Sequence, residues 1–383
     1  MKVLIAPDKF KGSLTALQVC NAIHEALITV DPTLELMDMP LADGGEGTCE
    51  LLTTFSNGVL INVEVRDPLF RKISTVYGLS KDSKIAFLEM AKASGLQLLK
   101  DDEKDPLITS TVGTGDMIRH ALDNGVEKIF IGIGGSATTD GGMGMADALG
   151  ILFHDRDGRR LKGIGQSMQH VHSIDINHVH PRLASVEFTV FCDVDNPLYG
   201  LNGAAYIFSP QKGANSTAVA QLDAGLKCFA RALEAGTNIN VNFAGAGAGG
   251  GLPAALKAFA KVDIQPGMDF ITHFIGLEEY IRSADVIITG EGKIDAQTMS
   301  GKVVKGVADL AGKYGKSLLV VAGKSELSDE VIHTLSIGKI VTLTNNNTPD
   351  VLAMANAYQL LGSRIREAWS DFNNWRTGSN AGN

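Results

Sequence analysis

The chain has 383 residues, of which 44% are hydrophobic, and its formal net charge at pH 7 is −9. This length exceeds what one hydrophobic core usually organises, so two globular domains are expected. The acidic balance argues against electrostatic capture of nucleic acid or of an anionic membrane, because both need a basic surface. No apolar stretch has the length of a signal segment or of a bilayer span, which predicts a soluble, cytoplasmic protein.

Short apolar, β-branched runs recur along the chain, and polar or glycine-rich residues follow them. Such runs are typical of parallel strands that are covered on both faces, and sheets of this kind bind ligands at the carboxyl ends of their strands. The pattern therefore predicts an α/β fold. The runs comprise residues 2–7, 128–133, 188–192, 286–289, 318–322 and 339–343.

A loop of six residues, 8–13, follows the first run and leads into an apolar pattern of helical period. Ser13 is the expected N-cap of that helix. Free backbone N–H groups and the helix dipole attract an anion there, and Lys11 adds a full positive charge. A charged surface turn with a helix cap is the alternative interpretation.

Two glycine-rich segments could let an anionic group approach the backbone. Residues 132–144 follow a predicted strand, so phosphate or substrate binding is favoured there over a close-packing turn. Residues 245–251 contain G-x-G-x-x-G without a convincing strand before it, which favours a second phosphate-facing loop or a hinge over a nicotinamide site. The candidate binding residues are Gly134, Gly135, Ser136, Thr138, Asp140, Gly247, Gly249 and Gly250.

Acidic residues flanked by glycine form a third kind of candidate site. Asp43 and Glu46 lie in one such loop, and Glu291, Lys293 and Asp295 lie in another. Phosphoryl transfer needs carboxylates to hold magnesium and cations to offset charge on the transferring group. The alternative interpretation of each loop is a polar turn.

One further acid, Asp193, follows the predicted strand over residues 188–192. It is the candidate for orienting or deprotonating an acceptor hydroxyl, a role that kinases give to a positioned Asp. Lys212, in a Gln-Lys-Gly segment downstream, is a basic group that could meet a phosphate or a carboxylate.

The order of these motifs resembles the type I glycerate kinase family from one end of the chain to the other. The resemblance implies ATP-dependent phosphorylation of D-glycerate to 2-phosphoglycerate, with Mg²⁺, in glyoxylate, glucarate or related catabolism. The motifs that carry it are residues 5–8 with 10–14, 42–48, 89–91 with 93–96, 113–115, 132–144, 192–194 with 196–198, 211–213, 245–251 and 289–295.

The resemblance also implies a domain arrangement. Residues 1–65 and 282–383 would form a Rossmann-like parallel-sheet domain, and residues 66–281 an inserted α/β domain, with the site in a cleft between them. In the mechanism that we expect, glycine loops and lysines hold the ATP phosphates, Ser13 and Lys212 among the binding residues. Asp43, Glu46, Glu291 and Asp295 are the candidate magnesium ligands, Asp193 presents the hydroxyl, and Lys11 with Lys293 stabilises the transition state.

Other functions stay open at this point. The chain lacks the P-loop and protein-kinase motifs, which excludes those two classes. A kinase of another small hydroxy acid, a 3-phosphoglycerate-forming enzyme and a non-catalytic sensor of a phosphorylated metabolite are the alternatives. The sequence does not fix the oligomeric state, for which a homodimer is one option.

Overall fold

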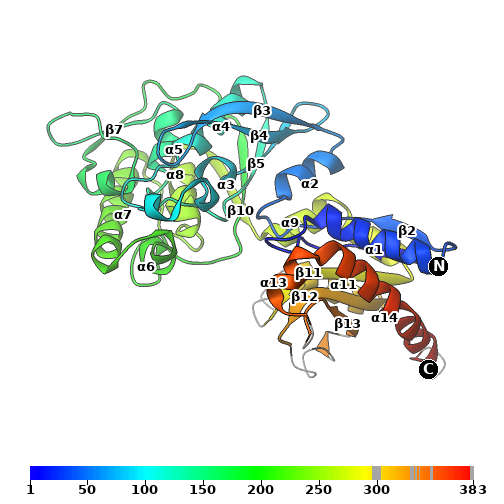
Figure 1. Cartoon of the computed structure of the whole chain (residues 1–383). Helices are drawn as coiled ribbons and strands as arrows, with labels where there is room; N and C mark the ends of the chain where they lie inside the picture. The colour runs from blue at the N-terminus through cyan, green and yellow to red at the C-terminus, as the bar shows by residue number, and fades with distance from the viewer. Residues whose placement is uncertain (296–302, 328–331, 333, 336, 346–347, 380–383) are drawn as a thin grey trace. The chain divides into compact units, whose positions relative to one another are not determined.

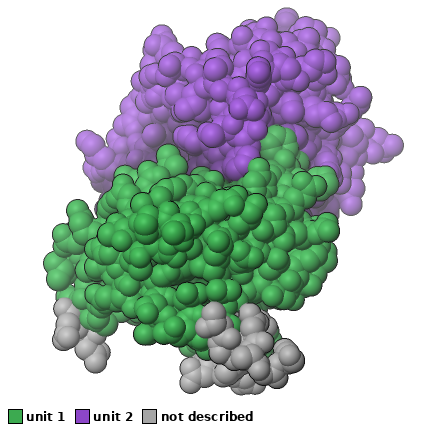
Figure 2. All heavy atoms as spheres, turned by 90° about the vertical axis from the view of Figure 1, so that its right-hand side faces the viewer, with its two compact units in different colours: residues 1–43, 268–383 green, residues 44–267 purple. Residues whose placement is uncertain are grey.

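The computed structural model describes residues 1–295, 303–327, 332, 334–335, 337–345 and 348–379. The chain divides into two compact units, which Figure 2 distinguishes by colour. Unit 1 combines Met1–Asp43 with Met268–Asn383, and unit 2 is Gly44–Gly267. Both ends of the chain therefore build the same unit, and a long insertion builds the other.

Unit 1 is organised by a five-stranded sheet of order β13-β12-β11-β1-β2, in which all neighbouring strands are parallel (Figure 1). Strand β1 from the start of the chain pairs with β11 from its last third, with Val3 opposite Val286. The strands are β1 (Lys2–Ile5), β2 (Glu35–Asp38), β11 (Val286–Ile294), β12 (Ser317–Ser325) and β13 (Ile337–Thr342).

Helices cover both faces of this sheet. Val3 and Ile5 belong to a buried cluster with α1 (Ala16–Val30) and α14 (Ala357–Ser379), which pack side by side (Figure 1). Leu4 is equally buried, and because side chains alternate along a strand it faces the other side, where α10 (Leu277–Ser283) and α11 (Val303–Lys313) pack. Burial on both faces explains why the strands are continuous apolar runs.

Unit 2 contains a six-stranded mixed sheet of order β10-β9-β6-β5-β4-β3. Strands β5, β6, β9 and β10 are parallel, whereas β3 and β4 form an antiparallel hairpin at one edge. The strands are β3 (Val59–Arg66), β4 (Lys72–Leu79), β5 (Ile85–Glu89), β6 (Lys128–Gly132), β9 (Glu187–Phe191) and β10 (Lys261–Gln265), and a separate pair is β7 (Leu152–His154) with β8 (Ser173–Asp175).

Helices of unit 2 pack on this sheet; α3 to α8 contribute to its large core cluster, whereas α2 (Thr48–Phe55) contacts β4 and β5. The longest is α7, whose N-cap Asn215 accepts a hydrogen bond from the backbone N–H of Ala218. The helices are α2 (Thr48–Phe55), α3 (Ala91–Ser94), α4 (Val112–Asp123), α5 (Met143–Ala148), α6 (Ala204–Phe208), α7 (Ser216–Thr237) and α8 (Leu252–Phe259).

The boundaries of the compact units lie at 43/44 and 267/268, whereas the sequence analysis placed domain boundaries at 65/66 and 281/282. At the first boundary, β3 pairs along its whole length with β4, so its residues belong to the sheet of unit 2. At the second, α10 packs against β1 and α11 of unit 1. Long-range strand pairing and helix packing, which the sequence does not display, set both positions.

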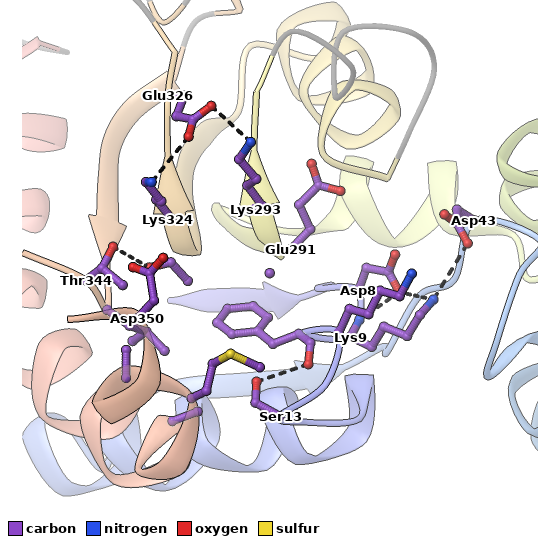
Figure 3. A pocket seen from close by; sticks show the side chains of 18 residues that line it. Asp8, Lys9, Ser13, Asp43, Glu291, Lys293, Lys324, Glu326, Thr344 and Asp350 are labelled. Atoms are coloured by element: carbon purple, nitrogen blue, oxygen red, sulfur yellow. Dashed lines mark hydrogen bonds and ion pairs between the residues drawn. The ribbon is translucent and has the colours of Figure 1, made fainter. Parts of the chain in front are cut away.

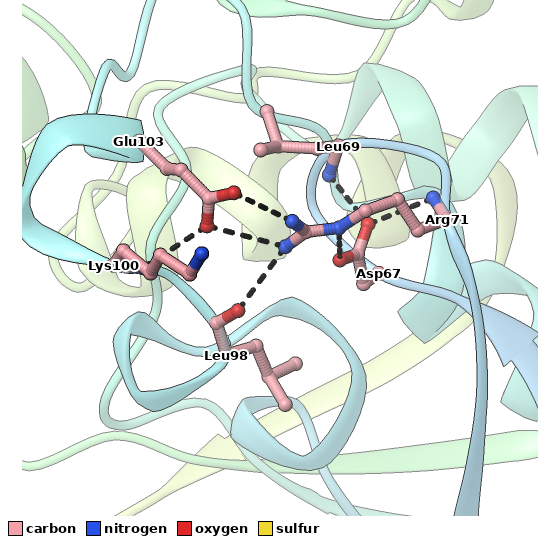
Figure 4. A network of polar contacts seen from close by, with 6 residues as sticks. All are labelled: Asp67, Leu69, Arg71, Leu98, Lys100 and Glu103. Carbon is pink, nitrogen blue, oxygen red and sulfur yellow. Dashed lines mark hydrogen bonds and ion pairs between the residues drawn. The ribbon is translucent and has the colours of Figure 1, made fainter.

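A buried carboxylate organises the turn of the β3–β4 hairpin (Figure 4). Asp67, only 2% exposed, accepts hydrogen bonds from the backbone N–H groups of Leu69 and Arg71 and from the Arg71 guanidinium. That guanidinium also bonds Glu103 and the carbonyl oxygen of Leu98. The hairpin turn is thereby fastened to the short 3₁₀ turns η1 (Leu96–Leu98) and η2 (Asp101–Glu103).

Helix α1 begins two residues later than the sequence analysis predicted. Its N-cap is Thr15, in a capping box in which Thr15 Oγ1 accepts from the Gln18 backbone N–H at 3.2 Å and Gln18 Oε1 accepts from the Thr15 N–H at 2.9 Å. The predicted N-cap, Ser13, instead donates its hydroxyl to the Phe10 carbonyl at 3.0 Å. A tight turn over residues 10–14 delays the helix, because Phe10 and Leu14 bond each other's backbone there.

This cap gives a stability prediction. Thr15→Ala removes one side of the capping box and should lower the free energy of unfolding by about 1 kcal/mol, the usual effect of losing such a cap. Urea unfolding followed by circular dichroism measures the change. Ser13→Ala is the matched comparison, and a larger loss for Ser13→Ala than for Thr15→Ala would contradict the assignment.

Candidate active site

A cavity of about 430 Å³ opens at the carboxyl end of the unit 1 sheet (Figure 3). The last residues of β11 and β12 line it, together with the segments that follow β1, β2, β12 and β13 and with α13 (Asp350–Ala355). The carboxyl ends of parallel strands meet at one edge of a sheet, so loops that are far apart in the sequence contribute to one site. Five of the predicted residues line this cavity, namely Lys11, Ser13, Asp43, Glu291 and Lys293.

One side of the cavity carries carboxylates. Asp8 and Glu291 are 5% and 7% exposed, and Lys9 Nζ lies 3.7 Å from an oxygen of Asp8 and 3.7 Å from an oxygen of Asp43. Burial raises the pKa of Asp8 to about 7; Lys9 opposes this shift, whereas the negative charges of Asp43 and Glu291 add to it. A buried acid that titrates near neutral pH is typical of a functional site.

The sequence analysis did not include Asp8 or Lys9 among the candidate site residues. The signal that could have identified Asp8 was its position, because it follows β1 at the carboxyl end as Asp193 follows β9. The sequence analysis instead selected Lys11 and Ser13, at the end of the loop over residues 8–13.

Lysines occupy another side of the cavity. Lys293 and Lys324 stand opposite each other on the neighbouring strands β11 and β12, a pairing of like charges that is unfavourable by itself. Glu326 lies between them, with its oxygens 3.0 Å from Lys293 Nζ and 3.4 Å from Lys324 Nζ, as Figure 3 shows. The predicted metal ligand Asp295 also contacts Lys293 Nζ, at 3.1 Å. The strand over 318–322 was predicted, so its carboxyl end could have indicated Lys324 and Glu326.

An apolar wall completes this cavity. Phe10 and Leu343 are buried, whereas Met354 on α13 is 50% exposed. Gly12 has φ +79°, and a Cβ there would approach Met354 Cε to 3.1 Å, so the turn brings its backbone directly against this side chain. The cavity therefore combines carboxylates, lysines and an apolar surface, a combination that suits a ligand with both charged and apolar parts.

In unit 2, the loop that carries Glu46 is held by a buried carboxylate. Glu89, 3% exposed at the end of β5, accepts hydrogen bonds from the backbone N–H groups of Gly47 at 2.9 Å and Cys49 at 2.8 Å. Burial raises the pKa of Glu89 to about 7; Lys92 and the two backbone bonds oppose the shift. Glu89 thus occupies the N-terminus of α2, while Glu46 is exposed on the loop.

The glycine-rich segment 132–144 lies at the carboxyl end of β6, close to that loop. A Cβ on Gly132 would stand 2.3 Å from the carbonyl oxygen of Gly44, and one on Gly134 would stand 3.9 Å from Gly45 Cα. Gly134 and Gly135 are exposed, and Gly135 has φ +71°. Only this exposed part of the segment offers its backbone to a ligand.

Asp140 holds the remainder of the segment together. Its fully buried carboxylate accepts hydrogen bonds from the backbone N–H and hydroxyl of Thr111, both at 2.8 Å, and from the backbone N–H groups of Gly142 and Gly144, both at 3.1 Å. Burial raises the pKa of Asp140, and the four hydrogen bonds oppose that shift. In this arrangement the carboxylate is engaged inside the loop.

Lys212 contacts the glycine-rich segment 132–144 from inside the protein. It is 2% exposed, and its ammonium group donates to the Ser136 hydroxyl at 2.8 Å and to the Thr138 carbonyl at 2.6 Å. Burial lowers the pKa of Lys212 to about 7, and the charge of Asp140 opposes this. Ser136, Thr138 and Lys212 are therefore in contact with one another, and the binding of a phosphate or a carboxylate by Lys212 stays a prediction.

Residues 245–251 pack directly on that segment. The backbone N–H of Gly141 donates to the carbonyl oxygen of Gly250 at 3.0 Å, and a Cβ on Gly250 would stand 2.0 Å from the Thr138 carbonyl oxygen. A Cβ on Gly247 would likewise stand 2.3 Å from a backbone oxygen, and Gly249 has φ +56°. Close backbone packing explains these glycines whether or not they also contact a ligand.

Asp193 lies just beyond the carboxyl end of β9 and is exposed. Its carboxylate accepts a hydrogen bond from the backbone N–H of Gly267 at 2.9 Å. Gly44 packs against Gly267, the partner of Asp193, and against Phe191 of β9, because a Cβ on Gly44 would stand 3.0 Å from both Gly267 Cα and Phe191 Cβ. Asp193 and the segment 132–144 thus both lie at the carboxyl edge of the unit 2 sheet. Of the predicted residues of unit 1, all except Asp295 line the cavity described above.

Carboxylate and carbonyl oxygens are the ligands that Mg²⁺ prefers, and the ion commonly takes only one or two protein carboxylates and completes its shell with water and substrate phosphates. Asp43 and Glu291 fit this donor chemistry within unit 1. Across the residues that the structure describes, no three His, Cys, Asp or Glu side chains form a preassembled metal-binding group. Magnesium held partly by a substrate is compatible with both observations.

Comparison with known proteins agrees with this fold. The profile of the Glycerate kinase family matches residues 3–372. Glycerate 2-kinase of Escherichia coli K12 is 42% identical over 352 residues, covering 91% of this chain and 92% of the relative. Glycerate kinase of Bacillus cereus ATCC 10987 is 40% identical over 366 residues, covering 95% of each. A crystal structure of a candidate glycerate kinase 2 from Salmonella typhimurium LT2 has a TM-score of 0.85 at 40% identity and covers 99% of each chain.

The fold and these matches define an enzyme, a phosphotransferase with an alcohol group as acceptor. The chain belongs to the glycerate kinase family. Within its described part, no helix is sufficiently long and apolar to pass through a membrane.

The close approach of Gly132 to Gly44 gives a prediction about loop packing. Gly132→Ala forces a methyl group against a backbone oxygen and should lower the free energy of unfolding by about 1–3 kcal/mol. Gly134→Ala is the matched control, because a Cβ there has its nearest atom 3.9 Å away. It should lower the free energy of unfolding clearly less. Equal losses in urea unfolding would show that the two loops are not packed as described.

Glu89 gives a prediction about pH. Its pKa in the folded protein is raised from the ordinary 4.5 to about 7, so the folded state binds more protons than the unfolded state between about pH 4.5 and 7. Its contribution to stability therefore falls as pH rises through that window and stays low above it. Glu89→Gln should gain stability relative to the parent as pH rises from 5 to 8, by up to about 3 kcal/mol.

Thermal unfolding of both proteins across this pH range measures the difference. The exposed Glu64, on β3, supplies the control Glu64→Gln. A stability difference between Glu89→Gln and the parent that does not change with pH would contradict the assignment.

Proposed function

We propose that the chain transfers the γ-phosphoryl group of ATP to D-glycerate and releases 2-phosphoglycerate and ADP. The observation that carries this proposal is the match to the glycerate kinase family over residues 3–372, together with 42% identity to a relative named for the 2-kinase activity. The cavity in unit 1 supports it, because lysines and carboxylates surround a space that suits a small charged ligand.

In this proposal Lys11 and Lys293 stabilise the negative charge of the transferring phosphoryl group. Both line the cavity at the carboxyl end of the unit 1 sheet, where fixed positive charge offsets charge that develops in the transition state. Asp8 and Lys9, which the structure adds to this site, would order the carboxylate side of the cavity through the contacts of Lys9 with Asp8 and Asp43.

Asp193 orients the glycerate hydroxyl and accepts its proton. The hydroxyl oxygen then forms a bond to the γ-phosphorus while the bond from that phosphorus to the ADP oxygen breaks. Its exposed position just beyond the end of β9, the strand that pairs with β6 ahead of the exposed Gly134 and Gly135, supports this role. Ser13, Ser136, Thr138 and the two glycine segments would hold or shape the binding sites for the ATP phosphates and for glycerate.

Magnesium would be held by one or more of Asp43, Glu46, Glu291 and Asp295. When bound, the ion neutralises charge on the nucleotide phosphates. A site in a cleft between the two domains, a homodimer and a place in glyoxylate or glucarate catabolism stay predictions.

The test is product identification. The purified chain with MgATP and D-glycerate should release ADP in a coupled assay, and phosphorus NMR should show 2-phosphoglycerate. A 3-phosphoglycerate signal, or turnover only with another hydroxy acid, would assign a different kinase reaction. Binding of a phosphorylated metabolite without any transfer would favour the sensor and refute the proposed activity.

Single substitutions test the proposed roles of Asp193, Lys11 and Glu291 in phosphoryl transfer. Asp193→Asn, Lys11→Met and Glu291→Gln should each lower kcat/KM by about 100-fold or more, because each removes a charge that acts in the transition state. Lys313→Met, on the exposed end of α11, is the matched control and should keep the parental rate. Full turnover by Asp193→Asn would remove that residue from the base role.

A further inference from the structure

The charge of Lys212 lies deeper in the protein than the charges of Lys293 and Lys324. Lys212 is 2% exposed, whereas the side chains of Lys293 and Lys324 are about half exposed. A charge taken out of water is costly unless it is paired, and the hydrogen-bond partners of the Lys212 ammonium group are a hydroxyl and a carbonyl oxygen, not a carboxylate. Its two hydrogen-bond acceptors, Ser136 and Thr138, are neutral.

The segment that carries Lys212 is anchored so that the ammonium group has little freedom to leave. Lys212 ends the 3₁₀ turn η4 (Pro210–Lys212), and its backbone N–H donates to the Ser209 carbonyl. The hydroxyls of Ser209 and Thr139 lie 2.9 Å apart, which fastens the turn to the glycine segment a second time. Gly213 has φ +99°, and a Cβ there would stand 2.0 Å from the Lys104 carbonyl oxygen.

The surroundings of the ammonium group contain one opposing charge. Asp140 is the titratable group whose charge acts on Lys212, and its carboxylate already accepts four hydrogen bonds within the segment. The hydroxyl oxygen of Thr138 is buried without a hydrogen-bond partner next to the lysine's acceptor. The positive charge is thus incompletely compensated in the ligand-free protein.

Within the same segment, Gly134 and Gly135 are exposed. They directly precede Ser136, whose hydroxyl accepts from Lys212. An anion on the exposed backbone would therefore lie near a buried positive charge that it does not contact. In a water-poor interior such a charge acts over several ångströms.

We propose that Lys212 positions the glycine segment from within and couples the binding of an anion on Gly134 and Gly135 to the uptake of a proton. The proposal rests on the proposed function, because it takes the segment as a ligand-binding loop. The ligand class is a small anion, either a nucleotide phosphate or the carboxylate of the hydroxy acid. Lys212 is a positioning residue in this scheme, since its ammonium group bonds the loop and not the ligand.

The coupling follows from the energetics of the buried ammonium. Its pKa of about 7 means that the group is largely neutral in the ligand-free protein at pH 8. A bound anion stabilises the charged form, raises the pKa of Lys212 and draws a proton from solution. The affinity for that anion should therefore be highest below pH 7 and decrease as pH rises.

The experiment is titration calorimetry of the full chain at pH 8 in buffers that differ in ionisation enthalpy, with ADP in one arm and D-glycerate in the other. The ligand whose anion occupies the loop should be bound with uptake of a substantial fraction of one proton, and the other ligand should not. Lys212→Met should abolish the uptake and weaken that ligand about tenfold at pH 6.5, with a smaller effect at pH 9. The exposed Lys227, on α7, supplies the control Lys227→Met, which should keep the parental uptake.

Proton uptake separates this role from a purely structural one, because a merely destabilised loop would bind more weakly at every pH without a change in proton stoichiometry. Absence of uptake with both ligands in the parent chain overturns the proposal, and so does equal uptake in Lys212→Met. The parent measurement stands by itself if the variant fails to fold. Phosphoryl transfer to glycerate without proton uptake would refute this inference and keep the proposed function, whereas absence of transfer would refute the proposed function.

Discussion

The pairing of β1 with β11 is the interaction on which the unit 1 site depends. It joins strands that are more than 280 residues apart, with Ile5 opposite Ile288, and it continues past the strand end, where the Asp8 backbone N–H donates to the Gly290 carbonyl at 2.8 Å. The Thr289 hydroxyl also donates to the Ala6 carbonyl at 2.7 Å. These bonds fix the register, so Asp8, beyond the end of β1, and Glu291, near the carboxyl end of β11, line the same cavity.

Buried charges have a comparable role in unit 2. Glu89, Asp140 and Lys212 each form hydrogen bonds with the backbone or the hydroxyls of a loop. Burying a charge is unfavourable, and each of these groups offsets part of that cost by holding a segment in one conformation. The loops at the carboxyl ends of the strands are therefore organised before any ligand binds, which limits the entropy that binding must remove.

The glycine-rich segments combine two demands. Gly134 and Gly135 expose their backbone, whereas Gly132 and Gly250 allow backbones to approach where any side chain would collide. A glycine count does not separate these uses. The distinction matters for interpreting variants, because a substitution at Gly250 tests packing, and only the exposed positions test ligand contact directly.

The sequence by itself determined the α/β class, the main parallel strands and the loops at their carboxyl ends, because strand hydrophobicity and glycine-bearing turns are local properties. It also indicated Lys11, Asp43, Glu291 and Lys293, which the structure brings into one cavity. Only the tertiary structure decided that Asp8, Lys324 and Glu326 share that cavity and that Thr15 caps α1. Tertiary structure likewise buried Glu89 and Lys212, and hence shifted their pKa values. The physical reason is that burial and proximity depend on which distant strands pair, and a local pattern carries no record of that pairing.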